Sequence, residues 1–142
     1  MKNNNKNGKN GKSDRILTPE EAKKRFLSTL GLAERAGKIV CGTQNVCDAL
    51  KFGVVSVVFE ASGNSDNTHK RLCDRCKYYK VDLIPADADA DTLGAALGRR
   101  GPISAAAVTD ASLGGAARRA AEDAAEAQKR ESEVSAEKEP EE

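Results

Sequence analysis

A glycine-led polar turn, Gly42-Thr43-Gln44-Asn45, separates a short apolar stretch from a helical pattern and carries groups suited to hydrogen bonding. The first backbone N–H groups of a helix have no partners within the helix and lie at the positive end of its dipole, so they favour an anion or a row of acceptors. The side chains of Gln44 and Asn45 each add a donor and an acceptor. The turn therefore has two interpretations: a plain strand-to-helix cap, or a site that binds phosphates and base edges.

A second group of chemically active residues is formed by four cysteines: Cys41, Cys47, Cys73 and Cys76. Cys73 and Cys76 have the spacing of a Cys-x-x-Cys pair, and the other two would complete a four-thiolate zinc set. However, Cys73 and Cys76 fall on the apolar stripe of a helical pattern, and the other pair lacks the spacing of a compact metal knuckle. We therefore expect buried, reduced thiols with a structural role, and we expect neither a metal nor another cofactor.

No pattern in the chain indicates catalysis. The single histidine, His69, lies among polar residues at a predicted helix start, where we expect it at the surface. The acids Glu60, Asp66 and Asp74 do not form a paired-carboxylate pattern, and the chain lacks nucleotide-binding and nucleophile-elbow motifs. We therefore expect no catalytic residue and no enzymatic activity.

The elements that must position these residues alternate between helix and strand patterns. Thr18 caps the first helix, in which Pro19 is the first helical residue and which ends near Gly37. Further helices are predicted at 43–52, 66–79, 91–97 and from about 111, and strands are predicted at 39–41, 54–59, 81–85 and 103–108. The run 54–59 is apolar on both faces, as in a central strand covered by helices. This alternation predicts an α/β fold, a three-layer α/β/α sandwich with a four-stranded mixed sheet.

Length and composition indicate one domain with two tails. The chain has 142 residues, of which 39% are hydrophobic, and we place the domain at 15–123. Residues 1–14 are predicted to form a disordered basic arm, and residues 124–142 a frayed helix followed by an acidic disordered tail.

Charge and hydropathy narrow the possible partners. The net charge of +1 hides an asymmetry, because residues 1–40 carry ten Lys/Arg and four Asp/Glu, whereas residues 111–142 carry five and nine. Overall charge therefore does not indicate nucleic-acid binding by itself. Without a bilayer-length apolar run or a hydrophobic signal core, we expect a cytoplasmic protein with no membrane contact.

Short motifs follow one another along roughly residues 26–118. They are Leu30-Gly31-Leu32-Ala33, Ala36-Gly37-Lys38, Gly42-Thr43, the strand Val54 to Phe59, Ala61-Ser62, Asn67-Thr68, Cys76-Lys77-Tyr78-Tyr79, Leu93-Gly94-Ala95-Ala96-Leu97-Gly98 and Ala107-Val108-Thr109-Asp110. In type and order, these motifs resemble those of the L7Ae/L30e ribosomal protein family, in its bacterial YlxQ-like branch.

The resemblance implies binding of structured RNA, typically a kink-turn, in which tandem sheared G·A pairs expose base edges in a widened groove. The RNA would be ribosomal, and the protein a monomer associated with the ribosome. The positions that carry over are Lys38 before the motif, the turn Gly42, Thr43, Gln44 and Asn45, and the loop and strand start Ile103, Ser104 and Ala105 beside a flipped-out nucleotide. From charge and position we add three candidates for backbone contacts, Lys70, Arg99 and Arg100.

The chain departs from the family pattern in the same turn. Many kink-turn readers have Asn and then Glu where this chain has Gln44 and Asn45, and Lys where it has Asp48. An acid that faces phosphate opposes the Coulombic attraction on which nucleic-acid affinity depends, so the RNA target is expected to differ from a standard kink-turn, or the affinity to be weaker. Two alternatives stay open: a protein-interaction module of the same fold that has lost RNA binding, and the substrate-recognition domain of an RNA methyltransferase whose catalytic domain is a separate chain.

Overall fold

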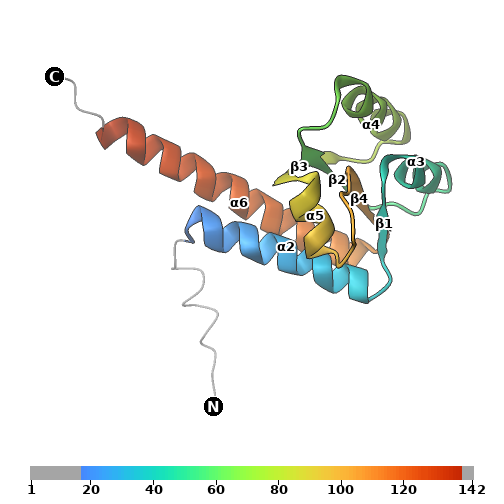
Figure 1. Ribbon diagram of the computed structural model, residues 1–142, viewed down its shortest axis with the longest axis horizontal. Coiled ribbons are helices and arrows are strands. Elements are labelled where there is room, and N and C mark those ends of the chain that lie inside the picture. The colour runs from blue at the N-terminus through green and yellow to red at the C-terminus, as the bar shows by residue number, and fades with distance from the viewer. Residues whose placement is uncertain (1–16, 139–142) are drawn as a thin grey trace, which may run out of the picture.

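The computed structural model describes residues 17–138, so the predicted basic arm lies outside the described residues. Helices and strands alternate along this range (Figure 1). In chain order they are α2 (Pro19–Arg35), β1 (Ile39–Cys41), α3 (Thr43–Lys51), β2 (Val57–Ser62), α4 (Asp66–Tyr79), β3 (Leu83–Asp89), α5 (Ala90–Ala96), β4 (Ala105–Val108) and α6 (Ala111–Lys138).

The four strands form one mixed sheet in the order β1-β4-β2-β3. Strand β4 is antiparallel to both of its neighbours, whereas β2 and β3 run parallel. Phe59 lies opposite Ala106 and Val58 opposite Ala107, so the two central strands pair a large side chain with a small one on each face. The predicted four-stranded mixed sheet is confirmed.

Helices cover both faces of the sheet, which confirms the three-layer arrangement. Figure 1 shows α2, α5 and α6 on one side and α3 and α4 on the other. The larger core lies under α2, α5 and α6, where the rings of Phe26 and Phe59 meet edge to face with centroids 5.0 Å apart. The second core packs Val46 and Leu72 of α3 and α4 against Val58. Alternate residues of each central strand therefore enter different cores, as a strand buried on both faces requires.

Two strands lie further along the chain than their β-branched residues predict. The second strand was expected at 54–59, but β2 covers Val57–Ser62, because the chain first turns at Gly53 and leaves Val54 half exposed. The third was expected at 81–85, but β3 covers Leu83–Asp89. The parallel pairing of β2 with β3 extends both strands through residues of low strand propensity, a tertiary effect that local sequence does not carry.

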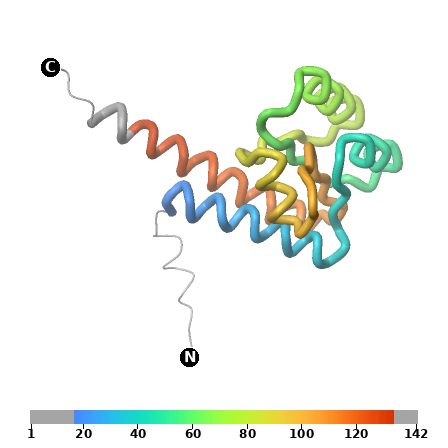
Figure 2. The backbone as a smooth tube through the Cα atoms, in the orientation of Figure 1, coloured from blue at the N-terminus to red at the C-terminus, as the bar shows by residue number. Residues whose placement is uncertain are grey.

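Helices α2 and α6 lie side by side and project beyond the sheet in the same direction (Figures 1 and 2). Ala124 and Ala127 of α6 are buried against Ala22 of α2, so packed helix continues past the boundary we expected at residue 123. Within 17–138, no helix combines the length and apolar character needed to cross a bilayer.

Candidate functional site

The turn between β1 and α3 depends on glycine at position 42. Gly42 has φ 95° and ψ 145°, a conformation that residues with a Cβ rarely adopt, and its N–H donates to the Ala105 carbonyl oxygen at 2.9 Å. Gly42 is the N-cap and Thr43 is the first helical residue, at the position where the predicted helix 43–52 begins. Because glycine has no side chain to bond the first turn, no side chain caps the N–H groups at the start of α3.

Thr43 joins the α3 turn to the loop that precedes β4. Its Oγ1 lies 2.6 Å from Oγ of Ser104, and both residues are partly buried. Two predicted site segments that are far apart in the chain are thus brought together. Ile103 and Ala105 flank this contact, but their side chains are in the cores, at 5% and 0% exposure. Of the three predicted loop positions, only Ser104 has an accessible side chain.

The two carboxamides of the turn are held by the protein. Gln44 accepts a hydrogen bond from Arg71 Nη2 at 2.6 Å through Oε1, and its Nε2 donates to Asp48 Oδ1 at 3.1 Å. Asn45 Nδ2 donates to the Cys41 carbonyl oxygen at 3.0 Å. The expectation that both amides present a donor and an acceptor outward is therefore too broad. Asn45 keeps its Oδ1 for an external donor, since no bond to that atom is found among the described residues.

Asp48 does not stand alone on the α3 surface. The chain of bonds Asp48–Gln44–Arg71 connects it to a guanidinium group on α4, which packs beside α3 (Figure 2). Arg71, rather than the predicted Lys70, reaches the turn. Lys70 Nζ instead pairs with Asp74 at 3.0 Å on the exposed side of α4. This arrangement supplies one positive charge at the position where the acid would otherwise repel a phosphate.

The remaining predicted cations, Lys38, Arg99 and Arg100, differ in their distance from the α3 turn and in whether an acid pairs with them. Lys38 is exposed but precedes β1, whereas the turn follows β1, so about 13 Å of extended chain separates the two. Arg99 Nη2 pairs with Glu34 Oε2 at 3.0 Å. Both charges lie near Cys41, where burial raises the pKa of the thiol and the Arg99 guanidinium partly offsets that rise. Arg100 is exposed in the loop between α5 and β4.

Glycine also fixes the loop that carries Ser104. A Cβ at Gly94 of α5 would overlap the carbonyl oxygen of Gly101, so the loop crosses the helix in direct backbone contact. Ile103 N–H, further along, donates to the Ala90 carbonyl oxygen at 3.0 Å. The loop is therefore fastened to α5 on one side and to the α3 turn on the other.

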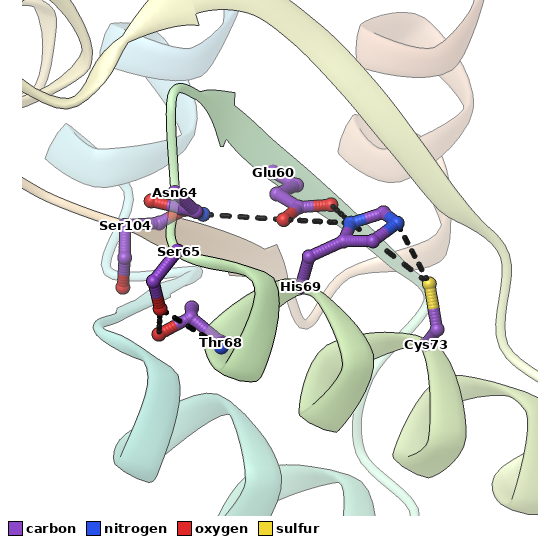
Figure 3. Close-up of polar contacts among 7 residues, drawn as sticks. All are labelled: Glu60, Asn64, Ser65, Thr68, His69, Cys73 and Ser104. Atoms are coloured by element: carbon purple, nitrogen blue, oxygen red, sulfur yellow. Dashed lines mark hydrogen bonds and ion pairs between the residues drawn. The ribbon is translucent and has the colours of Figure 1, made fainter.

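A buried carboxylate, which our sequence reasoning missed, supports the same loop. Asn64 Nδ2 donates to the Ser104 carbonyl oxygen at 3.0 Å and to Glu60 Oε2 at 3.2 Å. Glu60, 8% exposed, also contacts Nδ1 of His69 at 2.8 Å (Figure 3). The available signal was the acid itself, because a charged residue next to Val57-Val58-Phe59 in a buried strand requires a polar partner.

The cysteines only partly follow expectation. Cys47 and Cys76 are buried, and burial raises the pKa of Cys76 to about 11. Cys73 was expected on the buried side of its helix but is partly exposed beside His69. Among the described residues, no group of three or more His, Cys, Asp or Glu side chains is arranged to hold a metal ion.

Comparison with known proteins assigns the fold to a family. The model of the ribosomal protein L7Ae/L30e/S12e/Gadd45 family matches residues 24–114, which include the α3 turn and the loop before β4. The chain belongs to this family. Its YlxQ-like branch includes the RNA-binding protein YlxQ of Bacillus subtilis, 36% identical over 81 residues that cover 57% of this chain and 79% of that protein. The RNA-binding protein YlxQ of Enterococcus faecium is 29% identical over 72 residues, which cover 51% of this chain and 70% of the relative.

Solved structures agree with the L7Ae/L30e/S12e/Gadd45 fold. A protein of unknown function from Bacillus halodurans C superposes with a TM-score of 0.65 at 28% identity, over 69% of this chain and 97% of that one. The Giardia lamblia 15.5kD RNA binding protein superposes with a TM-score of 0.57 at 17% identity, over 76% and 88%, a likeness of fold alone.

Proposed function

We propose that this family member binds structured RNA at the edge where the α3 turn meets the loop before β4. The observation that carries the proposal is the contact between Thr43 and Ser104, which fixes two segments into one surface. A preformed surface favours RNA recognition by shape, because flexible segments would lose conformational entropy on binding. The YlxQ relatives are named for RNA binding, which supports the same class of ligand.

Each part of the edge has a role in this proposal. The N–H groups of the first turn of α3 would face a phosphate, with no acid in that turn to oppose it. The free Oδ1 of Asn45 would accept from a base amino group. Arg71 and Arg100 would neutralise neighbouring phosphates, whereas Lys38, beyond β1, would contribute at most at a distance.

The RNA class follows from these few contacts. With about two or three cations at the edge, the electrostatic part of the affinity is small, so most selectivity would come from a bent or bulged RNA that fits the edge. We propose a kink-turn-like or bulged element, with ribosomal RNA as the source and the ribosome as the assembly.

An electrophoretic shift assay with a panel of kink-turns, bulged hairpins and ribosomal RNA fragments tests the proposal. The expected result is tight binding to at least one bent or bulged RNA and much weaker binding to a straight duplex of equal length. No binding to any of them at low salt would refute it. Nuclease-resistant association with partner proteins, without RNA binding, would instead support the protein-interaction alternative.

A further inference from the structure

A cleft of about 780 Å³ opens between α6 and the ends of β2 and β3. One wall is α6, which passes β3 before it projects beyond the sheet (Figure 1), and the other wall is formed by β2, β3 and the start of α4. The volume is in the range of sites that hold small organic ligands. The residues that the RNA-binding proposal places against RNA do not line this cleft.

Small apolar side chains leave the space between the two walls open. Ala121 and Ala125, one helical turn apart on α6, border the cleft from one side, and Ile84 and Ala86 of β3 border it from the other. Most of the lining surface is apolar, and the methyl groups of alanine fill little of the gap. A ligand with an apolar body would therefore be stabilised here, because that body leaves water.

The exposed polar groups of the lining are mainly acidic. The carboxylates of Asp87 and Glu122 have no hydrogen bond or ion pair with any other described residue. Asp66 also lines the cleft, but it lies in the first turn of α4, where the helix dipole stabilises an acid. Lys129 is the only lysine or arginine that the described lining contains. Asp87 and Glu122 are therefore free to pair with a positively charged ligand.

A buried carboxylate adds to the negative charge of the lining. Glu60, 8% exposed, accepts a bond from Asn64 at 3.2 Å and contacts Nδ1 of His69 at 2.8 Å (Figure 3). These two partners hold the carboxylate in place, and its oxygens can accept further bonds. Charges interact more strongly in such a partly desolvated place than in water, so Glu60 also favours a cation in the cleft.

The backbone of β3 brings Asp87 to the cleft. Between the pairs Glu60–Pro85 and Ser62–Asp89, three residues of β3 lie opposite one residue of β2, so β3 bulges. Asp87, in the middle of the bulge, has φ 57°, a left-handed conformation that Asp and Asn adopt more readily than most residues. An asparagine at this position would therefore remove the charge and keep the backbone.

The same lining disfavours two other kinds of occupant. Strand β3 is at the edge of the sheet, but Pro85 within it has no N–H to donate, so the edge is poorly suited to pairing with an added strand. RNA is disfavoured because its phosphates would be repelled by Asp87 and Glu122. A small cation meets neither obstacle.

We propose that this cleft binds a small organic cation with an apolar body. The body lies between the alanines of α6 and Ile84, and the carboxylates of Asp87 and Glu122 stabilise the positive group. Binding is noncovalent. The site is distinct from the RNA edge, so this inference does not rest on the proposed function.

Titration of the full chain, freed of nucleic acid, with thioflavin T tests the proposal. Thioflavin T is an aromatic cation whose fluorescence rises in a confined site, and 8-anilinonaphthalene-1-sulfonate, an aromatic anion, is the matched probe. We expect one thioflavin T per chain, bound about tenfold or more tightly than the anion. Absence of saturable thioflavin T binding, or equally tight binding of the anion, would overturn the proposal.

A substitution that fills the cleft tests its location. Ala125→Trp should abolish binding of thioflavin T, whereas Ala116→Trp, at an exposed position of α6 outside the cleft, should leave it unchanged. RNA binding in the shift assay should be the same in both variants and the wild type, so failure of this proposal can be told apart from failure of the RNA proposal. Thioflavin T binding that persists in Ala125→Trp would show that the dye binds elsewhere.

The charge requirement is tested without filling the cleft. Glu122→Gln and Asp87→Asn should each weaken thioflavin T binding about three- to tenfold and narrow its preference over the anion. Glu131→Gln is the matched control, because it removes an exposed acid of α6 that does not line the cleft. Equal losses in Glu122→Gln and Glu131→Gln would mean that only the overall charge matters and would refute the site. Circular dichroism checks that each variant is folded.

Discussion

The hydroxyl groups of Thr43 and Ser104 lie 2.6 Å apart across 61 positions of sequence, and this contact joins the first turn of α3 to the loop before β4. Further hydrogen bonds hold the backbone on both sides of this contact. Gly42 donates to the Ala105 carbonyl oxygen, and Asn64 donates to that of Ser104. The proposed RNA edge is therefore part of the hydrogen-bonded framework at the end of the sheet rather than a pair of free loops.

The double variant Gln44→Ala with Asn45→Ala should weaken RNA binding without a large loss of stability. Both side chains are exposed, so we expect the free energy of unfolding to change by about 1 kcal/mol or less, while the Kd rises about tenfold or more. Titration of a bound RNA identified in the shift assay measures the Kd. Gln128→Ala, an exposed glutamine of α6, is the matched control. A double variant that binds like the wild type would mean that RNA docks elsewhere.

Arg71→Ala should affect RNA binding more than Lys70→Ala, although the two residues are adjacent. Arg71 bonds to Gln44 in the turn, whereas Lys70 pairs with Asp74 on the exposed side of α4. Loss of one phosphate contact should lower the slope of log Kd against log salt by about one and raise the Kd several-fold. Binding at several salt concentrations checks this. A larger effect of Lys70→Ala would mean that Lys70, the residue predicted from the sequence, contacts the RNA instead of Arg71.

Gly94→Ala should destabilise the protein and displace the loop that carries Ser104. The added methyl group would overlap the Gly101 carbonyl oxygen, and we expect a loss of about 1–3 kcal/mol together with weaker RNA binding. Chemical denaturation measures the loss. Gly115→Ala in α6 is the matched control: its Cβ would meet open space, so a gain of roughly 0.5–1 kcal/mol is expected from helix propensity. Equal responses of the two variants would contradict the close approach.

Alkaline pH should destabilise the fold partly through Cys76. Burial raises the pKa of Cys76 from 9.0 to about 11, so the folded state holds the thiol proton more tightly than the unfolded chain. This contribution to stability is complete below pH 9 and is lost as the pH rises toward 11, by an amount of about 2–3 kcal/mol. Urea unfolding of the wild type at pH 8 and pH 11 measures it. Cys76→Ala, which lacks the thiol, should lose less stability over the same interval, and an equal loss would exclude the thiol as the cause.

Much of the fold could be predicted because it depends on local patterns. Thr18 and Glu21 form the expected capping interactions at α2, and Asp110 bonds the Leu113 N–H at the start of α6. The limits of β2 were harder to predict. Ala61 and Ser62 have little preference for strands, and they are extended because Ala61 N–H donates to the Ser104 carbonyl oxygen and Ser62 pairs with Asp89 of β3.

The candidate site also has a part that local sequence predicts and a part that depends on contacts between distant residues. The turn at Gly42 could be predicted from the sequence because glycine followed by polar residues favours a turn through local conformation. The partners of Gln44 and Ser104 could not, since Arg71 lies 27 positions from Gln44 and Asn64 lies 40 positions from Ser104. Such contacts depend on how helices pack across the sheet, which periodicity does not specify.

The alanine contact between α2 and α6 has a geometric consequence. Beyond the sheet, Ala22, Ala124 and Ala127 are the buried residues of this contact, with Leu17 packed against them. Methyl groups leave little between two backbones, so the axes of the paired helices can neither widen nor slide without losing that contact. Where they are in contact, the two helices therefore form a stem of fixed width that extends beyond the sheet.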